Sequence, residues 1–253
     1  MLEVHVLASG SDGNCTIIEC DGEAVMIDAG ISCKRIQELM DVAGVDREVV
    51  KALLITHEHS DHISGAGAVA RRFDIPVMTN IATYEASHLG NVRFQPVDCT
   101  SSFEVGGMRV TPLPTSHDAV DPCCYFTETD CGRVLLATDT GRLNFQIEHA
   151  MARADLAIIE SNYDPEMLAN GPYPYYLKQR IKGDRGHLSN FDCADAIRRN
   201  TSEGTQLFLA HLSKKNNVPD LARQTVSDVT GIDRRKIDCM EFPGDVRNIT
   251  VRV

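Results

Sequence analysis

Short apolar runs recur along this chain, and a histidine or an acidic residue stands at or just past the end of each. The runs span residues 51–56, 133–137, 156–160 and 206–210. Continuous apolar runs of this length fit strands buried inside a layered fold. In layered α/β folds, functional sites gather at strand ends. The sequence therefore predicts buried strands whose ends carry polar side chains.

The order of the remaining segments predicts two strand-rich halves, each followed by helices. Strand-like patterns also cover residues 2–8, 16–20, 23–28, 76–78, 93–96, 102–105, 108–113 and 123–129,. Helical patterns cover residues 31–43, 64–73, 82–88, 143–152, 173–182, 191–201 and 218–230,. Asp21-Gly22 suits a hairpin turn, and Gly44 suits a helix end,. With no linker rich in Pro, Gly or Ser, we expect one α/β domain over residues 1–253, with two mixed sheets packed face to face and helices outside.

Composition places the chain in the ordinary globular class. Apolar residues make up 43% of its 253 residues, and no apolar run is long enough for a membrane span. The first residues lack the basic-then-apolar order of a signal peptide. Nine cysteines, an odd number without a C-x-x-C pair, indicate reduced thiols,. Cys123 and Cys124 would face opposite sides of a strand. We therefore expect a cytoplasmic protein without a membrane partner.

The net charge of −11 limits how the chain can meet nucleic acid. A globally acidic protein repels nucleic acid at long range, which counts against a broad DNA-coating surface. A local basic channel remains compatible with this charge, and bound divalent cations would offset part of it.

The segment HEHSDH follows directly after the apolar run 51–56. His57 and His59 are two residues apart, so in an extended segment their rings project to the same side,. Asp61 and His62 follow where the chain is expected to turn into a helix. Imidazole and carboxylate together suit Zn²⁺, Mn²⁺ or Fe. The segment therefore predicts a metal site that addresses two neighbouring cations.

Such a site needs further ligands from elsewhere in the chain. His117, Asp139 and His211 each follow an apolar strand-like segment. Taken alone, each has an ordinary explanation: a loop histidine, a turn former before Thr140-Gly141, and a capping group. Their repeated placement at strand ends makes them candidate ligands.

The sequence resembles the metallo-β-lactamase superfamily over nearly its whole length. The resemblance rests on the order IDAG, H-x-H-x-D-H, a lone histidine, ATDTG and a late histidine. It implies the αββα sandwich of that superfamily and two metal sites. By resemblance, one metal takes His57, His59 and His117, the other takes Asp61, His62 and His211, and Asp139 bridges both. Asp28 corresponds to the structural aspartate behind the site, which orients ligands.

Later segments of the sequence indicate which group within the superfamily the chain resembles. Asp139 stands where the true β-lactamases, which are secreted, carry a cysteine, and this disfavours antibiotic hydrolysis. The segments GSDGNC, ESNYD, GHLSN and HLSKKNN resemble the YycJ-like (WalJ) group, whose members include a double-stranded DNA 5′ exonuclease. The layout of Glu160 and His187 also resembles ribonuclease Z, where such a pair protonates the leaving oxygen. The long glycine-rich insert of ribonuclease Z is missing.

These residues predict phosphodiester hydrolysis. A water between two cations is a hydroxide near neutral pH, and Asp61 would aim it. The leaving 3′-oxygen needs a proton, which His187, oriented by Glu160, would supply. We therefore expect a two-metal nuclease, with DNA exonuclease activity from 5′ to 3′ as the leading interpretation and zinc or manganese, or else iron, as the metal.

Basic residues flank the predicted site residues. The substrate-binding candidates are Lys178, Arg180, Lys182, Arg185 and Lys214. They would neutralise phosphates of a DNA or, less favoured, RNA substrate. Tyr173, Tyr175 and Tyr176 could stack on bases, and packing within the fold is the alternative,.

Two other interpretations stay open on the sequence. The acidic charge favours a small substrate, either a cyclic or alkyl phosphodiester or a thioester of the glyoxalase II kind. A metal-stabilised scaffold without activity is the third, and the complete ligand set argues against it.

Overall fold

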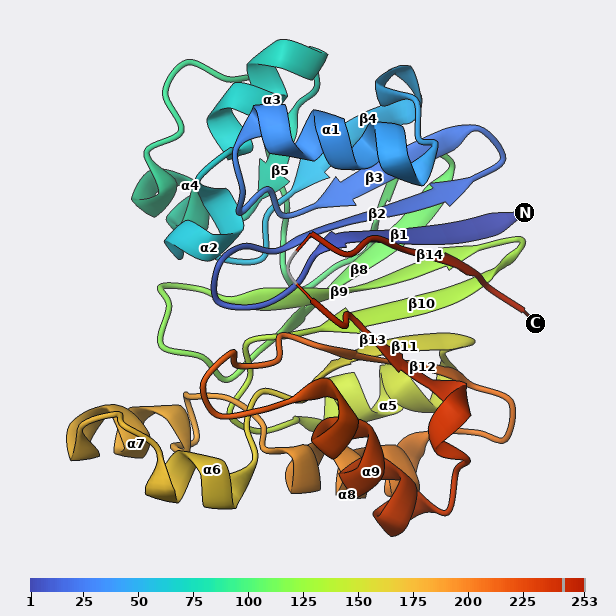
Figure 1. Ribbon diagram of the computed structural model, residues 1–253. Helices are drawn as coiled ribbons and strands as arrows, with labels where there is room; N and C mark the ends of the chain where they lie inside the picture. The colour runs from blue at the N-terminus through green and yellow to red at the C-terminus, as the bar shows by residue number, and fades with distance from the viewer. Residues whose placement is uncertain (243, 253) are drawn as a thin grey trace.

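Two seven-stranded sheets lie face to face in the computed structural model, which describes residues 1–242 and 244–252 (Figure 1). The first sheet has the spatial order β14 (Arg247–Thr250), β1 (Leu2–Ala8), β2 (Cys15–Cys20), β3 (Glu23–Ile27), β4 (Val50–Leu54), β5 (Val77–Thr79), β6 (Phe94–Pro96). The second has the order β13 (Ile237–Cys239), β12 (Gln206–Ala210), β11 (Leu156–Glu160), β10 (Gly132–Ala137), β9 (Cys123–Thr129), β8 (Met108–Pro114), β7 (Phe103–Val105). Both sheets are mixed, with parallel pairing through β3–β6 and through β10–β13.

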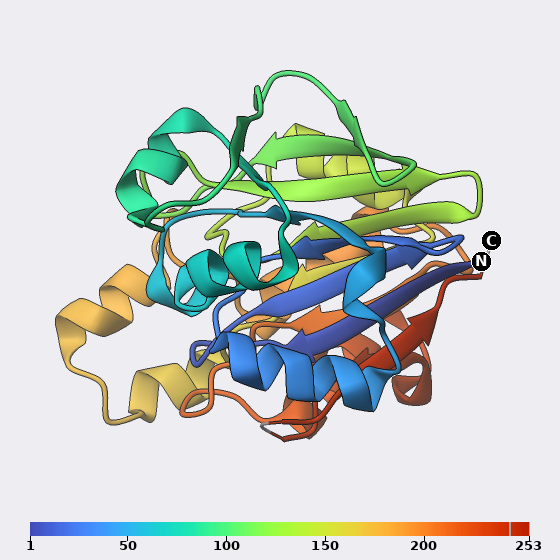
Figure 2. The ribbon, with the colours of Figure 1, turned by 90° about the horizontal axis from the view of Figure 1, so that it is seen from above.

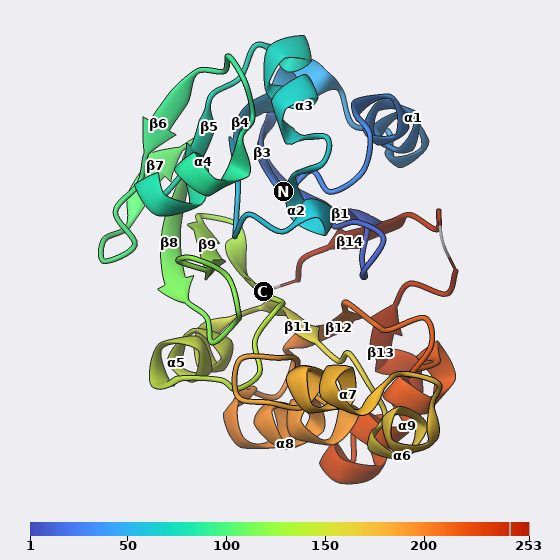
Figure 3. The same ribbon diagram turned by 90° about the vertical axis from the view of Figure 1, so that its left-hand side faces the viewer.

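Helices cover the outer face of each sheet, which confirms the predicted αββα sandwich (Figures 1 and 2). On the first sheet lie α1 (Cys33–Ala43), α3 (Ala66–Phe73) and, near the end of the strands, α2 (Ser60–Ile63) and α4 (Ile81–Ser87). On the second lie α5 (Phe145–Arg153), α8 (Asn190–Asn200) and α9 (Pro219–Thr230). The short α6 (Pro165–Asn170) and α7 (Tyr175–Ile181) project from one end of the second layer (Figure 1), the end that faces the viewer in Figure 3. Single 3₁₀ turns span Arg47–Val49 and Arg234–Lys236.

Three apolar layers hold these elements together. The layer between the sheets takes side chains from both halves of the chain, among them Val6, Ile27, Tyr125 and Phe208. One outer layer packs the first sheet against α1 and α3, and the other packs the second sheet against α5, α8 and α9. On β9, Cys123 faces the inner layer while its neighbour Cys124 faces the outer one, as the alternation of a strand requires,.

The structure departs from the sequence-based expectations at a few elements. The helix expected to begin at residue 64 is preceded by α2, so Asp61 and His62 already lie in a helical turn. The edge strands β13 and β14 and the helix α6 were not predicted. Gly44 ends α1 in the left-handed conformation, as expected. Across the described residues, no helix is long and apolar enough to cross a bilayer.

Candidate metal centre

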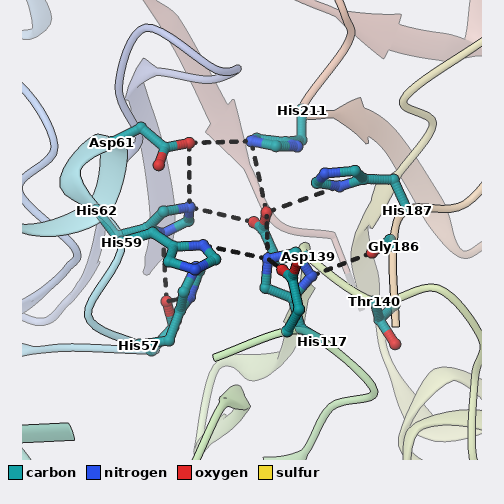
Figure 4. A network of polar contacts seen from close by, with 12 residues as sticks. His57, His59, Asp61, His62, His117, Asp139, Thr140, Gly186, His187 and His211 are labelled. Carbon is teal, nitrogen blue, oxygen red and sulfur yellow. Dashed lines mark hydrogen bonds and ion pairs between the residues drawn. The ribbon is translucent and has the colours of Figure 1, made fainter. Parts of the chain in front are cut away.

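All seven predicted metal ligands meet at one edge of the sandwich, between the two sheets (Figure 4). They come from the segments that follow β4, β8, β10 and β12. Ligand atoms of His57, His59 and His117 lie within 4.8 Å of one another, and so do those of Asp61, His62 and His211. The edge of each sheet therefore contributes to both trios.

Asp139 lies between the two trios. Its Oδ2 atom is 3.2 Å from Nε2 of His62, and its Oδ1 atom is 3.7 Å from Nε2 of His117 and 3.6 Å from Nε2 of His211. Within the first trio, Nε2 of His117 is 3.3 Å from Nδ1 of His59. One carboxylate thus faces ligands of both trios, which is the arrangement that a bridging ligand needs.

The donor atoms fit divalent cations. Nε2 of His57, Nε2 of His211 and Oδ2 of Asp139 are buried, and among the described residues none of them has a hydrogen-bond partner. An unsatisfied buried polar atom costs about 1–3 kcal/mol. Because these atoms face a common space lined by imidazole and carboxylate, coordination of a cation such as Zn²⁺ or Mn²⁺ would satisfy them.

The electrostatics of the centre also favour a cation. Burial is the largest influence on the pKa of His62 and lowers it, but Asp139 and Asp28 outweigh burial and raise that pKa to about 10. Burial and then the neighbouring His62 hold the pKa of His57 well below its usual value. The carboxylates that attract a proton to His62 would equally attract a metal ion.

Three of the site residues have an unusual backbone conformation that directs their side chains into the site. Asp28, Asp139 and His211 have φ values of 59°, 55° and 56°. This left-handed region costs a residue with a side chain roughly 1–2 kcal/mol. Each residue directly follows a strand or lies within two residues of one, so the local turn directs its side chain into the site.

Asp28 holds one ligand from behind. Its Oδ2 atom accepts a hydrogen bond of 2.7 Å from Nδ1 of His62, which leaves Nε2 of that ring facing the centre. The backbone N–H and the hydroxyl of Thr56 donate to Asp28 at 2.9 and 2.8 Å. Asp28 therefore fixes the tautomer and the orientation of His62.

Several supporting residues were not singled out in the sequence. The backbone N–H of Asn14 donates to the Asp61 carbonyl at 2.8 Å, and its side-chain amide lies 3.0 Å from Nε2 of His62. The amide of Asn162 donates to the His211 carbonyl at 2.8 Å. Both asparagines lie in segments that carry the family resemblance, GSDGNC and ESNYD, but no role could be assigned to the asparagines themselves from the sequence.

The loop that carries His117 is held from the second half of the chain. The Gly186 carbonyl accepts from Nδ1 of His117 at 3.1 Å, and Nε of Arg185 donates to the His117 carbonyl at 3.1 Å. Arg185 was predicted to contact substrate, and the structure shows that its guanidinium also supports a ligand loop.

Glu160 and His187 form a pair beside the ligands. Oε1 of Glu160 accepts from Nδ1 of His187 at 2.7 Å and from Nδ1 of His211 at 3.0 Å. Burial alone would raise the pKa of Glu160, but His187 outweighs it and lowers that pKa. Burial lowers the pKa of His187, and Glu160 reverses this and raises it. The pair therefore favours a charged imidazolium next to Asp139.

The other basic candidates lie around the same edge. Arg180 pairs with Asp118, and Lys214 pairs with Asp12. Nζ of Lys178 donates to the Ala169 carbonyl at 2.7 Å. Lys182 is exposed at the end of α7. Three of these four side chains are thus partly engaged within the protein.

Comparisons with known proteins agree with this geometry. The metallo-beta-lactamase superfamily pattern matches residues 8–151. The chain is 40% identical to exodeoxyribonuclease YycJ of Bacillus anthracis over 240 residues, which covers 90% of this chain and 89% of that protein. It is 38% identical to exodeoxyribonuclease WalJ of Streptococcus pneumoniae, over 87% of this chain and 85% of that protein.

A solved structure shows the same fold at low sequence identity. The metallo-beta-lactamase fold protein YhfI from Bacillus subtilis superimposes with a TM-score of 0.73 at 16% identity, over 98% of this chain and 99% of that one. Fold, pattern and identity point the same way: the chain is a metal-dependent hydrolase that belongs to the metallo-β-lactamase superfamily, in the group of YycJ and WalJ.

Proposed function

We propose that this protein is a two-metal-dependent DNA exonuclease that digests from the 5′ end. The observation that carries the proposal is the Glu160–His187 pair: Nδ1 of His187 lies 2.7 Å from Oε1 of Glu160 and 3.8 Å from Oδ1 of Asp139, where the ring would serve as a proton donor. A good leaving group such as a thiolate needs little protonation, whereas the 3′-oxygen of a nucleotide needs it. The names of the YycJ and WalJ relatives support DNA as the substrate.

Each metal trio would hold one divalent cation, zinc or manganese in preference to iron, and the pair of cations would activate water and offset the charge that develops on the phosphate. Asp61 is the one carboxylate within the two trios, and its side chain is 23% exposed. Its free oxygen would accept a hydrogen bond from the attacking water and direct that water at phosphorus.

His187 would complete the reaction on the opposite side of phosphorus. As the water oxygen bonds to phosphorus, the bond from phosphorus to O3′ breaks, and the ring of His187 donates its Nε2 proton to that oxygen. The ring is 21% exposed, so it reaches a substrate at the mouth of the site. Glu160 stabilises the imidazolium from behind, and such acid assistance contributes about 10²–10⁴-fold.

Phosphates next to the cleaved bond would be met by basic side chains around the site. The candidates remain Lys178, Arg180, Lys182, Arg185 and Lys214. A substrate phosphate would compete with the protein carboxylates for Arg180 and Lys214. We also propose that the protein works in the cytoplasm, because all nine cysteines are free thiols,.

A nuclease assay tests the proposal. Protein loaded with Mn²⁺ or Zn²⁺ is given a duplex labelled at either end, a single strand, a small diester and a thioester. We expect mononucleotides or short fragments from the 5′ end, and no cleavage by a His59→Ala, Asp61→Ala variant. Turnover of only the small diester or the thioester would replace the proposal with a metabolite hydrolase.

A further inference from the structure

The helix α7 exposes an aromatic surface that the fold itself does not use. Tyr175 and Tyr176 are 76% and 75% exposed, and no residue of this helix is fully buried. The helix projects from the body at the end where the metal ligands gather (Figures 2 and 3).

The position of α7 is nevertheless fixed relative to the metal centre. Its Arg180 pairs with Asp118, the neighbour of the ligand His117. At its end, the Ile181 carbonyl accepts a hydrogen bond of 2.8 Å from the backbone N–H of His187. The backbone hydrogen bond to His187 thus keeps the two tyrosines near the metal centre even where a substrate phosphate displaces Asp118 from Arg180.

The neighbouring segment ties the helix to the other ligand loop. Nζ of Lys215 lies 5.8 Å from the ring centre of Tyr173, just before α7, and Lys215 follows the ligand His211 closely in sequence. The segment from Tyr173 to Arg180 therefore contacts residues that neighbour both His117 and His211.

Charge indicates what kind of molecule fits this surface. The segment Tyr175–Lys182 carries Lys178, Arg180 and Lys182 and no acidic residue, although the whole chain has a net charge of −11. Exposed aromatic rings among cationic side chains match a nucleic-acid strand, whose bases stack on rings and whose phosphates pair with cations.

The position of the leaving oxygen indicates in which direction a bound strand would run across this surface. In the function proposed above, on which this inference rests, His187 protonates O3′, so the nucleotide that carries O3′ lies on the side of His187. That nucleotide is on the 5′ side of the cleaved bond. Tyr176 is five residues from Ile181, about 7.5 Å along a helix at ~1.5 Å per residue, so the tyrosines would meet bases near the cut.

We infer that α7 is a stacking platform on which Tyr175 and Tyr176 hold the bases on the 5′ side of the cleaved phosphodiester, so that the fragment released from the 5′ end carries at least two nucleotides. Stacking of one base on an aromatic ring is worth about 1–3 kcal/mol. At roughly 1.4 kcal/mol per factor of ten, loss of one ring would slow cleavage by about 5- to 150-fold.

The test combines removal of a ring with removal of a base. Single-turnover cleavage is measured for the wild type, Tyr175→Ala and Tyr176→Ala, on single strands in which one abasic residue is moved through the positions around the cut. Tyr175→Phe and Tyr176→Phe keep the ring, and Val42→Ala removes an apolar side chain that is also exposed, on α1. Turnover of bis(p-nitrophenyl) phosphate reports on the metal centre alone.

If the platform exists, the alanine variants lose about 5- to 150-fold on the intact strand, while the phenylalanine variants, Val42→Ala and the turnover of the small diester stay near wild type. The loss disappears when the abasic residue occupies a stacked position, and that position lies on the 5′ side. An equal loss on every abasic strand, or no loss at all, overturns the platform, and disappearance on the 3′ side overturns its polarity. A wild type that cleaves no nucleic acid overturns the proposed function instead.

Discussion

The candidate site residues stand at strand ends, and the sequence indicates their identity better than their orientation. His57, Asp139 and His211 follow apolar runs, so their place at an edge of the sandwich could be predicted. The left-handed backbone of Asp139 and His211 could not, because residues with side chains seldom adopt it and no local pattern requires it,.

At the residue scale, the proposed role of His187 predicts how its substitution changes the hydrolysis of two substrates. In His187→Ala, hydrolysis of DNA should fall by about 10²–10⁴-fold, because O3′ leaves without a proton. Hydrolysis of bis(p-nitrophenyl) phosphate should change by less than about tenfold, since nitrophenolate leaves unprotonated. Initial rates on both substrates under identical metal loading measure this difference.

Glu160→Gln should show the same pattern more weakly, because the amide still positions the ring of His187 but no longer stabilises its charge. Equal losses on the two substrates would mean that His187 supports the metal centre rather than the leaving oxygen.

The residues that support the candidate ligands could not be predicted from the sequence. Thr56 and Asn14 contact Asp28, Asp61 and His62 through the folded chain. Threonine and asparagine are common in turns and at strand ends, so neither stands out without the structure. The candidate ligands are easier to recognise, because histidine and aspartate at these spacings are less common than threonine and asparagine in turns.

At the scale of elements, close backbone packing sets the geometry of the second trio. A Cβ atom built on Gly30 would lie 1.6 Å from the Asp61 carbonyl oxygen and 2.7 Å from the backbone nitrogen of Asn14. The segment after β3 therefore touches the start of α2 directly. Only glycine allows the loops of Asp28, Asp61 and Asn14 to meet.

Gly30→Ala should therefore displace Asp61 and weaken metal binding. We expect at least a tenfold weaker apparent affinity for the second metal ion, together with about 1–3 kcal/mol lower stability from overpacking. Calorimetric titration with Zn²⁺ and thermal unfolding measure the two effects.

Gly231→Ala is the matched control. Gly231 ends α9 with φ 77° and has open space where a Cβ atom would stand. The substitution should cost about 1–2 kcal/mol of stability through backbone strain and leave the metal affinity unchanged. Identical metal binding in Gly30→Ala and the wild type would contradict the packing argument.

Elements differ in how well the sequence predicts them. The continuous apolar runs of β11 and β12 and the helical period of the capped helix α1 are clear signals, and the structure agrees with them closely. The three-residue β13 and the edge strand β14 have no such signal, because their pairing depends on neighbours distant in sequence. For α2, the sequence predicted a turn into a helix at Asp61 and His62 but began the helix only at residue 64.

At the scale of the whole molecule, we propose that residues 1–253 form one cooperative unit. The layer between the sheets draws Val6 and Ile27 from the first half and Phe208 from the second. Because neither half can bury its inner face alone, scanning calorimetry should show one unfolding transition. Two separate transitions would mean that the halves unfold independently.

Phe208→Ala should lower that single transition without splitting it. The side chain is fully buried between the sheets, and Phe→Ala substitutions in cores cost about 3–5 kcal/mol. Loss of stability confined to one half of the chain, measured by hydrogen exchange, would argue against a shared core.

The central claim is that two bound cations and one proton donor make this acidic protein a nuclease. The most direct measurement is a titration of the metal-free protein with Mn²⁺, in which bound metal and single-turnover cleavage of a 5′-labelled duplex are followed together. The account predicts that cleavage rises as the second ion per chain binds and that it is absent from Asp139→Ala at every metal concentration used. Full cleavage with one ion per chain, or no cleavage with two ions bound, would contradict it.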